Sequence, residues 1–465
     1  MTSTAQCYKI VLQSISTSTQ LGLMYRITAW GMPRRALCVL HTRSGLQEQV
    51  FYAHVAGYRS FFMQATFSHF AGRRVHLGVC GSVAAYKAVE LARLFQKADM
   101  FVSCTLTDAA CQFISPLTFE GIGASPVYTK MFDDTQNSCF SHLDPGFMAD
   151  VFVLAPASAT TLARLATGMA ETMLAAQCLA FHGPLVLAPA MNPRMWAHPA
   201  TQANVALLHQ RGATLVGPAG GNVACGEEGV GKLEDIHTIF LHTLKALAPQ
   251  NLAGKTVLVT LGPTREQWDG VRFWSNPSTG HMGGVLALAA WLRGASVVAV
   301  AGPGTPALPK GIHTVPVTSA KEMLEAAEAH WHKADIGIFT AAVADFSPVP
   351  FGPSKFKKAT AGQDLTVQFT PNKDILATLS LAKNSSQKVL GFAAETENLE
   401  ERTRGKLHAK KAHLMAGNTV GEPGSGFGSA TNTMFVVDAN GKEEHWENTS
   451  KADIAWRLLD WLLTL

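Results

Sequence analysis

Hydrophobic residues form short, regularly spaced runs along the chain from about Arg73 onward. Continuous apolar runs of the kind found in strands buried on both faces occupy residues 75–80, 101–106, 151–155, 184–188 and 214–216. Between them the apolar residues follow helical spacing, as at Val83, Tyr86 and Val89. Strands that alternate with helices in this way predict βαβ units and a parallel sheet.

A second series of the same kind follows a linker near residues 244–255. Its predicted strands are residues 256–260, 295–301, 336–342, 388–393, 433–438 and 442–447. Its predicted helices are residues 281–293, 319–333, 374–383, 399–412 and 451–464. We therefore expect two α/β domains, residues 72–248 and 252–465, with no internal repeat between them.

The first 71 residues lack sustained periodicity, which is compatible with disorder. They carry six Lys or Arg side chains and one acid, Glu48, so their net charge is +5 and the other 394 residues of this +4 chain sum to −1. Such a composition is typical of a transit peptide, and equally of sequence translated upstream of the true start codon. Both alternatives stay open, and we assign this segment no function.

Composition excludes several classes of protein. The chain is 47% hydrophobic and 15% charged, which rules out disorder as the dominant state, and no apolar stretch reaches the ~18 residues of a membrane span. The neutral body lacks the basic stripe of a nucleic-acid binder. Eight cysteines form no C-x-x-C pair, which favours reduced, buried thiols in a soluble cytoplasmic protein.

Small residues and hydroxyls follow four predicted strands of the first domain, in segments 78–82, 105–108, 155–158 and 188–192. Because the carboxyl ends of parallel strands meet at one edge, these turns should share a crevice. Backbone amides at helix starts bind phosphate there. The turns predict a site for a phosphorylated cofactor, with contacts from Gly81, Ser82, Thr107 and Ser158.

Two other glycine-rich segments imitate nucleotide-binding motifs. Gly226–Lys232 matches the start of a P-loop, but Leu233 stands where a Mg²⁺-binding hydroxyl is needed. Residues 424–428 hold alternate glycines without the strand–turn–helix context of a dinucleotide fingerprint. We expect neither segment to bind a nucleotide.

Three motifs of the first domain occur together. They are Pro189–Pro193, which contains Asn192, then His142 ahead of Ala149-Asp150, and Ala224–Gly231, which contains Cys225. Together they resemble the flavin-dependent cysteine decarboxylases. They resemble more closely the N-terminal half of the bifunctional phosphopantothenoylcysteine decarboxylase/phosphopantothenate–cysteine ligases of coenzyme A synthesis, from about Arg73 to Ile239. The resemblance implies a flavodoxin-like domain that binds FMN.

The resemblance also implies a reaction and roles for these residues. Oxidation of the substrate thiol to a thioaldehyde gives the carboxylate's electrons a sink, and the flavin accepts a hydride and later returns it. His142 would act as base and position the substrate, Asn192 would bind the departing carboxylate, and Cys225 would protonate the enethiol. The structural alternatives are a core histidine, an Asn-Pro turn and a buried thiol. Glu171-Thr172 departs from the family's usual Asn-Asp or Asp-Asn.

The second domain concentrates lysines beside glycine-rich strand ends. Lys355, Lys357 and Lys358 form one loop, while Lys406 and Lys410 lie four apart on one helical face. A solvated surface is the ordinary explanation of lysines, but this setting favours a polyphosphate ligand. A loop at residues 275–283 leads into a helix, whose amides would point at an anion.

These segments, with 372–375, 391–396 and 416–418, resemble the ligase half of the same bifunctional proteins over residues 252–465. The resemblance implies a Rossmann-like fold in which CTP and Mg²⁺ convert 4′-phosphopantothenate to an acyl-cytidylate that cysteine then attacks. Asn276 and Arg272 would bind the acyl-cytidylate and phosphopantothenate, and no metal ligand is assigned. The implied CTP contacts are Phe339, Thr340, Ala341, Asp345, Lys355, Lys373, Asp374, Ile375, Leu376, Phe392, Lys406 and Lys410.

Three positions depart from the ligase pattern. Gly270 stands where a proline is usual, His281 where a lysine is usual, and Lys373 where proline is common. His281 replaces a fixed cation with a group that titrates near pH 6.5, so we predict weaker phosphate binding without loss of activity.

The sequence thus predicts a bifunctional coenzyme A biosynthesis enzyme. The alternatives are a flavoprotein regulatory subunit, and a decarboxylase with an inactive ligase domain. A nicotinamide dehydrogenase is excluded because no G-x-G-x-x-G follows the first strand. The resemblance further implies a homo-oligomer built from trimers, up to a dodecamer, with His142 serving a neighbour's site and with no nucleic-acid or membrane partner.

Overall fold

The computed structural model describes residues 36–38, 51–53, 65–132, 140–222, 226–357, 365–420, 429 and 431–465. The chain divides into two compact units, Met1–Phe61 and Phe62–Leu465. The described part of the first unit is an antiparallel pair of strands, β1 (Ala36–Cys38) and β2 (Phe51–Ala53), which the sequence did not predict. The sheets, helices and sites described below belong to the second unit.

Six parallel strands form the first sheet, in the order β5-β4-β3-β6-β7-β8. Apart from the two-residue edge strand β5, this is the flavodoxin order, which confirms the predicted fold class. The strands are β3 (Arg74–Val79), β4 (Phe101–Leu106), β5 (Val127–Tyr128), β6 (Val151–Ala157), β7 (Leu185–Pro189) and β8 (Thr214–Leu215).

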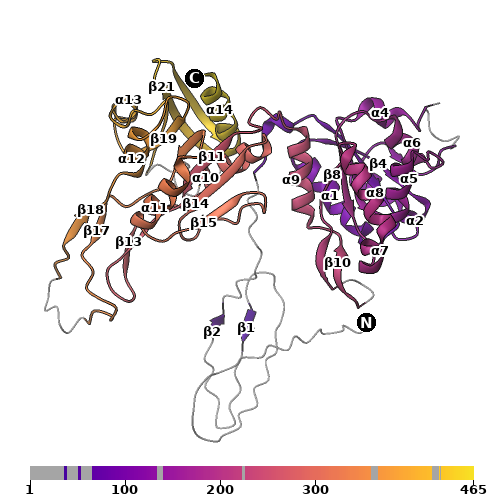
Figure 1. Ribbon diagram of the computed structural model, residues 1–465, viewed down its shortest axis with the longest axis horizontal. Helices are drawn as coiled ribbons and strands as arrows, with labels where there is room; N and C mark the ends of the chain where they lie inside the picture. The colour runs from indigo at the N-terminus through magenta and orange to yellow at the C-terminus, as the bar shows by residue number, and fades with distance from the viewer. Residues whose placement is uncertain are drawn as a thin grey trace, which may run out of the picture. The chain divides into compact units, whose positions relative to one another are not determined.

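Helices cover both faces of the first sheet, with α1 and α9 on one side and α5, α6 and α8 on the other (Figure 1). A parallel sheet needs this double cover because its strands are apolar on both faces. The helices are η1 (Ser68–Phe70), η2 (Val83–Ala85), α1 (Tyr86–Lys97), α2 (Asp108–Cys111), α3 (Pro116–Gly121), α4 (Asp144–Met148), α5 (Ala159–Thr167), α6 (Met173–Ala180), α7 (Pro193–Ala197), α8 (Pro199–Gln210) and α9 (Ile236–Leu247).

The P-loop-like segment Gly226–Lys232 is largely a strand. Here β10 (Glu228–Lys232) pairs antiparallel with β9 (Ala219–Asn222). The glycines therefore lie in a hairpin, and α9 begins only at Ile236, so the segment lacks the loop that leads directly into a helix in a P-loop. The second glycine-rich segment, 424–428, lies outside the described residues.

The second sheet has eight strands in the order β15-β14-β11-β16-β19-β20-β21-β22. Its first six positions follow the classic Rossmann order, as predicted, and β21 and β22 add an antiparallel hairpin at one edge. The strands are β11 (Thr256–Leu261), β14 (Ser296–Ala301), β15 (His313–Pro316), β16 (Ile336–Phe339), β19 (Lys388–Glu395), β20 (Leu414–Thr419), β21 (Thr431–Asp438) and β22 (Glu443–Ser450).

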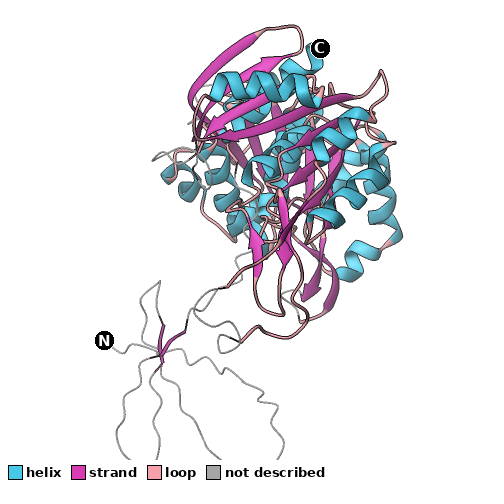
Figure 2. Ribbon diagram, turned by 90° about the vertical axis from the view of Figure 1, so that its left-hand side faces the viewer, coloured by secondary structure: helices cyan, strands magenta, loops and turns pink. Residues whose placement is uncertain are grey.

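Helices again lie on both sides of these strands (Figure 2). They are α10 (His281–Leu292), α11 (Ala320–Trp331), α12 (Ile375–Leu381), α13 (Leu399–Lys410) and α14 (Lys451–Thr464). Two short hairpins extend from this half of the chain, β12 (Arg265–Gln267) with β13 (Phe273–Ser275), and β17 (Phe346–Pro348) with β18 (Phe369–Pro371). Figure 1 shows β17 and β18 projecting away from the sheet.

Helix α10 approaches the second sheet as closely as its glycines permit. A Cβ added at Gly283 would lie 2.2 Å from Thr340 Oγ1 and 2.5 Å from Leu261 Cβ, so a larger residue cannot be accommodated there. The turn ahead of the helix uses Gly280 at φ +69°, a conformation that favours glycine. Residues 283–292 are buried, which explains the long apolar run in the sequence.

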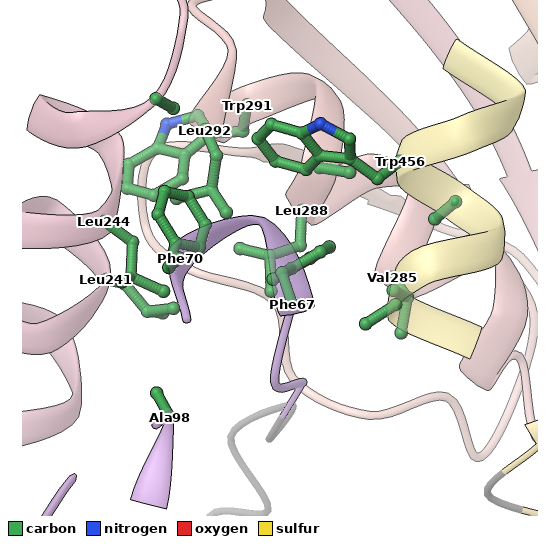
Figure 3. Packing of buried hydrophobic residues seen from close by; sticks show 14 of the residues in the cluster. Phe67, Phe70, Ala98, Leu241, Leu244, Val285, Leu288, Trp291, Leu292 and Trp456 are labelled. Carbon is green, nitrogen blue, oxygen red and sulfur yellow. The ribbon is translucent and has the colours of Figure 1, made fainter. Parts of the chain in front are cut away.

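A hydrophobic cluster joins the helices of both sheets (Figure 3). Phe67 and Phe70, each 1% exposed, lie within it, and both rings contact Trp456 of α14 at centroid distances of 5.5 Å. The Ser68 amide and hydroxyl donate hydrogen bonds to Asp453 Oδ1 at 2.9 and 2.7 Å. Residues 67–70, to which the sequence assigned no role, therefore connect the two halves of the second unit.

Most strands and helices predicted from apolar runs are confirmed, with ends that differ by a few residues. Strands β5, β15 and β20 and the short hairpins were missed. Cys80, Cys104 and Cys178 are buried free thiols and Cys111 is half-buried and free, which confirms the expectation for the cysteines whose side chains are described. None of the described helices is both long and apolar enough to cross a membrane.

We predict that Phe70→Ala lowers the free energy of unfolding by about 3–5 kcal/mol, because it removes a fully buried ring and leaves a cavity between the two halves. Urea denaturation followed by tryptophan fluorescence measures the change, since Trp456 reports on this cluster. Phe101→Ala is the matched control, because Phe101 is 66% exposed and its loss should change stability by less than about 0.5 kcal/mol. Equal effects of the two substitutions would contradict the prediction.

Candidate functional site

A cavity of about 740 Å³ lies at the carboxyl edge of the first sheet, and we call it the first cavity. All four predicted cofactor contacts line it: Gly81 and Ser82 follow β3, Thr107 follows β4, and Ser158 follows β6. Its volume lies within the range of about 300–1,000 Å³ that is common for ligand sites. The structure therefore brings together the strand ends that the sequence singled out.

Hydroxyl caps fix the backbone around the first cavity. The side chains of Ser82, Thr107 and Ser158 accept hydrogen bonds from backbone amides two or three residues ahead, at 3.2, 3.2 and 3.3 Å. A Cβ added at Gly81 would lie 2.5 Å from Ala109 Cβ, so this turn depends on glycine. Helix starts held in this way present backbone N–H groups to an anion, which fits a phosphorylated cofactor.

Several residues that line the first cavity were not predicted to contact the cofactor. Arg164 of α5 forms an ion pair with Glu171 at 3.1 Å, and both line the cavity. Thr172 also lines it, and its hydroxyl caps α6 by accepting from the Ala175 amide. Although Glu171-Thr172 differs from the family's usual residues, Thr172 still caps a helix and Glu171 is still paired with Arg164 at the wall of the first cavity.

Asn192 occupies the start of α7, next to the first cavity, which Met191 and Met195 line. Its Oδ1 accepts from the Arg194 amide at 2.8 Å, and its Nδ2 donates to Glu227 Oε2 at 2.9 Å. Arg194 forms an ion pair with the other oxygen of Glu227 at 2.9 Å. The amide of Asn192 is thus already hydrogen-bonded to a carboxylate of the protein itself.

Of the other two predicted catalytic residues, His142 does not line the first cavity in one chain. Cys225 lies outside the described residues, in the connection between β9 and β10. His142 is half-buried and precedes α4, on the turn that also carries Ser141. Phe140 and Phe147, which flank this turn, are 62% and 77% exposed, so the region around His142 presents apolar surface.

A second cavity of about 660 Å³ opens at the carboxyl edge of the second sheet, between the ends of β11 and β16. This is the switch point at which a Rossmann sheet reverses its strand order and binds ligands. All the predicted nucleotide contacts except Lys355 line it, and so does Asn276. The Asn276 amide donates to the Val343 carbonyl at 3.0 Å, which ties the loop ahead of α10 to the end of β16.

Two predicted lysines of the second cavity are paired with carboxylates. Lys406 Nζ lies 2.6 Å from Glu395 Oε1, and Lys410 is paired with Asp374, which also caps α12. Burial by itself would raise the pKa of Glu395, but its hydrogen bonds and proximity to Lys406 and Arg402 lower it. These lysines therefore meet an anion with their charges already partly compensated.

Lys451 is a residue of the second cavity that the sequence did not suggest. It begins α14, is 4% exposed and lines the cavity, and burial lowers its pKa. His281, the first residue of α10, also lines the cavity, and its pKa is lowered by burial and then by the charge of Lys451. Lys451 therefore brings a cation to the wall where His281 stands in place of a lysine.

Arg272 and Lys355 lie together, but neither lines the second cavity. Arg272 forms an ion pair with Asp269 at 2.8 Å, and Asp269 also accepts from the Phe356 amide. Burial would raise the pKa of Asp269, but backbone hydrogen bonds and Arg272 bring it to about 2. A Cβ at Gly270 would lie 2.1 Å from the Pro353 carbonyl, so the proline usual there does not fit this backbone.

Metal-binding side chains do not cluster in the described part of the chain. No group of three or more His, Cys, Asp or Glu side chains there is placed to hold a metal ion. A divalent cation that acts here would need oxygen ligands from a substrate as well.

Comparisons with known proteins match both halves of the chain. The family model described as Flavoprotein matches residues 64–247, and the model described as DNA/pantothenate metabolism flavoprotein C-terminal domain matches residues 252–465. The coenzyme A biosynthesis bifunctional protein CoaBC of Bacillus subtilis (strain 168) is 40% identical over 397 residues, which cover 84% of this chain and 97% of that protein.

The CoaBC protein of Escherichia coli (strain K12) is 39% identical over 373 residues, covering 80% of this chain and 92% of that protein. Among solved structures, the FMN-dependent cysteine decarboxylase SpaF is 32% identical, with a TM-score of 0.34, and the match covers 38% of this chain and 99% of that one. The two family models and the two relatives, each covered over more than 90% of its length, all indicate the same family. The chain therefore belongs to the family of bifunctional coenzyme A biosynthesis proteins, in which a flavoprotein decarboxylase is joined to a phosphopantothenate–cysteine ligase.

Proposed function

We propose that the second cavity joins cysteine to 4′-phosphopantothenate with CTP, and that the first cavity decarboxylates the product to 4′-phosphopantetheine. The observation that carries the proposal is that each carboxyl edge holds a cavity: all four predicted cofactor contacts line the first, and all the predicted nucleotide contacts except Lys355 line the second. On this proposal, residues 72–248 form the decarboxylase domain and residues 252–465 the ligase domain.

FMN is the cofactor that we propose for the first cavity. The flavoprotein family match and the FMN dependence of the relative SpaF support it. The capped turns at Ser82, Thr107 and Ser158 suit a phosphate, and the absence of a Cβ at Gly81 lets the backbone approach closely. A bound flavin would supply reversible hydride acceptance, which decarboxylation of a cysteine derivative needs.

Asn192 is the residue that we assign to the substrate carboxylate. Glu227 now accepts the hydrogen bond of its amide, so a substrate carboxylate would take the position of the Glu227 oxygen. An amide held at one end by the Arg194 backbone binds a leaving carboxylate without losing orientation. His142 would serve as the base and Cys225 would return a proton to the enethiol product.

CTP is the co-substrate that we propose for the second cavity. Lys406, Lys410, Lys373 and the start of α10 would neutralise its triphosphate. Mg²⁺ would be held mainly by phosphate oxygens, with Asp345 as an exposed carboxylate of the cavity wall. The lysines exchange Glu395 and Asp374 for the more highly charged triphosphate, which favours binding.

A homo-oligomer built from trimers would complete the first cavity. His142 does not line it in a single chain, and the neighbouring helices α4 and α6 present exposed Phe147, Met148 and Leu179. A patch of this kind marks an interface with another protein surface. Pairing of ligase domains into a larger assembly would likewise bring Arg272 and Lys355, which lie outside the second cavity of their own chain, to a partner's second cavity. The buried free thiols support a cytoplasmic location.

The two activities should be separable by mutation. Asn192→Ala removes one carboxylate donor, so we expect decarboxylation to fall about 10²–10³-fold while ligation persists. Lys406→Met removes a charge-assisted contact, so we expect the KM for CTP to rise about 10–100-fold while decarboxylation persists. Mass spectrometry of reactions with 4′-phosphopantothenate, cysteine, CTP and Mg²⁺, and separately with phosphopantothenoylcysteine, measures both steps.

Lys321→Met is the matched control, because Lys321 is exposed, pairs with Glu325 on α11 and lies outside both cavities. If the wild-type protein is folded and yellow but neither conversion occurs, the flavoprotein regulatory alternative replaces our proposal. If only added phosphopantothenoylcysteine reacts, the ligase domain is inactive.

His281 should make phosphate binding depend on pH. Its pKa lies below 6.5, so the ring is neutral at pH 7 and gains charge only as the pH falls through that pKa. The KM for 4′-phosphopantothenate should therefore fall with decreasing pH more steeply in the wild type than in His281→Gln. The substrate's own phosphate titrates in both proteins, so the difference between the two pH profiles reports on His281. His281→Lys should lower the KM about fivefold at pH 7.5, because a charged donor replaces a neutral one. An unchanged KM in His281→Lys would refute this prediction.

Charge on the exposed apolar patch should break the trimer. A Phe147→Glu/Leu179→Glu double variant places carboxylates where we propose a subunit interface, and burying them unpaired is costly. Sedimentation velocity should show a loss of trimers and a fall in decarboxylation, with ligation retained. Leu381→Glu, at an exposed leucine of α12, is the control and should sediment as the wild type. An unaltered sedimentation coefficient in the double variant would place the interface elsewhere.

A further inference from the structure

A chain of polar side chains crosses the apolar core between the first sheet and α6. His76 on β3, Thr105 on β4 and Gln177 on α6 are each 0% exposed. His76 Nε2 lies 2.9 Å from Thr105 Oγ1, which donates to Gln177 Oε1 at 2.6 Å. Gln177 Nε2 in turn donates to the carbonyl of Ser141 at 3.1 Å, one residue before His142.

The hydrogen bonds of this chain can run in only one direction. Because Gln177 Oε1 can only accept, the single proton of Thr105 is used there, and Thr105 must accept from His76 Nε2–H. His76 Nδ1, 2.8 Å from Ser103 Oγ, then accepts from that hydroxyl. Burial lowers the pKa of His76 to about 3, so the ring is neutral and carries the one proton that this arrangement requires.

Stability alone does not account for this series of hydrogen-bonded side chains. Its members lie beside apolar groups, including the Phe152 ring at 4.5 Å from the His76 ring and the side chain of Leu174 from the same helix as Gln177. A buried polar group that loses its partner costs about 1–3 kcal/mol, and apolar residues of the same shape would avoid that risk. A fully paired polar network does fix geometry, and the group it fixes here is the Ser141 carbonyl.

The turn that carries Ser141 packs on the same helix. A Cβ added at Gly146 of α4 would lie 3.1 Å from the Ala180 backbone, at the end of α6. The turn closes on itself through Leu143 and Asp144 amides, which donate to the Phe140 carbonyl at 2.7 and 2.9 Å. The start of α6 lines the first cavity through Thr172, Met173 and Leu174, so one helix contacts both the cavity and the turn ahead of His142.

We propose that Gln177, held by Thr105 and His76, is a positioning residue that orients His142 for decarboxylation through the Ser141 carbonyl. The inference rests on the proposed decarboxylase activity and on the role of His142 in it. A reacting group displaced by about 1 Å can lose about 10²-fold in rate, so a single buried bond beside the base has leverage on kcat.

The test compares Gln177→Met and Gln177→Glu in the full-length protein, with phosphopantothenoylcysteine as substrate. Gln177→Met keeps the volume but removes both hydrogen bonds, and we expect kcat to fall about 10–100-fold while KM and flavin content change less than about threefold. In Gln177→Glu the protonated acid still accepts from Thr105 and donates to Ser141. Its carboxylate cannot donate, so kcat should approach the wild-type value at low pH and fall at high pH, with an ionisation that the wild type lacks.

Thr243→Val is the matched control, because Thr243 is also 0% exposed but donates only within α9, to the Ile239 carbonyl. It should lose stability in urea without a specific loss of kcat. The inference is overturned if the kcat of Gln177→Met falls only in proportion to its folded fraction, or if Gln177→Glu follows the wild-type pH profile. A wild-type protein that fails to decarboxylate overturns the proposed activity and, with it, this inference.

Discussion

Both sheets depend on the burial of both of their faces. Parallel strands are joined by crossover helices, and those helices must cover apolar strands on each side. Because every crossover returns the chain to the edge where the strands begin, the carboxyl ends of all the parallel strands lie together at the opposite edge, where the turns into the next helices leave a crevice. The first and second cavities are therefore consequences of one packing constraint, applied twice along the chain.

The same constraint explains which elements the sequence could predict. Strands buried on both faces, such as β6 and β11, are continuous apolar runs that can be identified without neighbours. Strand β20 reads Leu-Met-Ala-Gly-Asn-Thr, and its small and polar residues give no such run, because it borders the second cavity. Phe67 and Phe70 were missed for another reason: isolated aromatics show no period, and their partner Trp456 lies at the far end of the chain.

The sites divide in a similar way. Motif residues such as Ser158 and Asp374 are local, since each caps the helix that follows its strand, and the sequence predicted their places at the cavities. Lys451 carries no motif, and it reaches the second cavity only because α14 packs against α10. Gln177 reads in the sequence as one polar residue in an apolar helix, and its meaning depends on hydrogen bonds to two other elements.

The side chains that we assign to anionic ligands are already paired with carboxylates of the protein itself. Glu227 accepts from Asn192, and Glu395 and Asp374 pair with Lys406 and Lys410. Each pair keeps a charged or polar side chain oriented before the ligand arrives, which reduces the ordering cost of binding. The exchange also limits the gain, because a ligand contributes only the difference between its own interaction and the one it displaces. A triphosphate exceeds a single carboxylate in charge, whereas a substrate carboxylate merely equals Glu227 and can leave readily as CO₂.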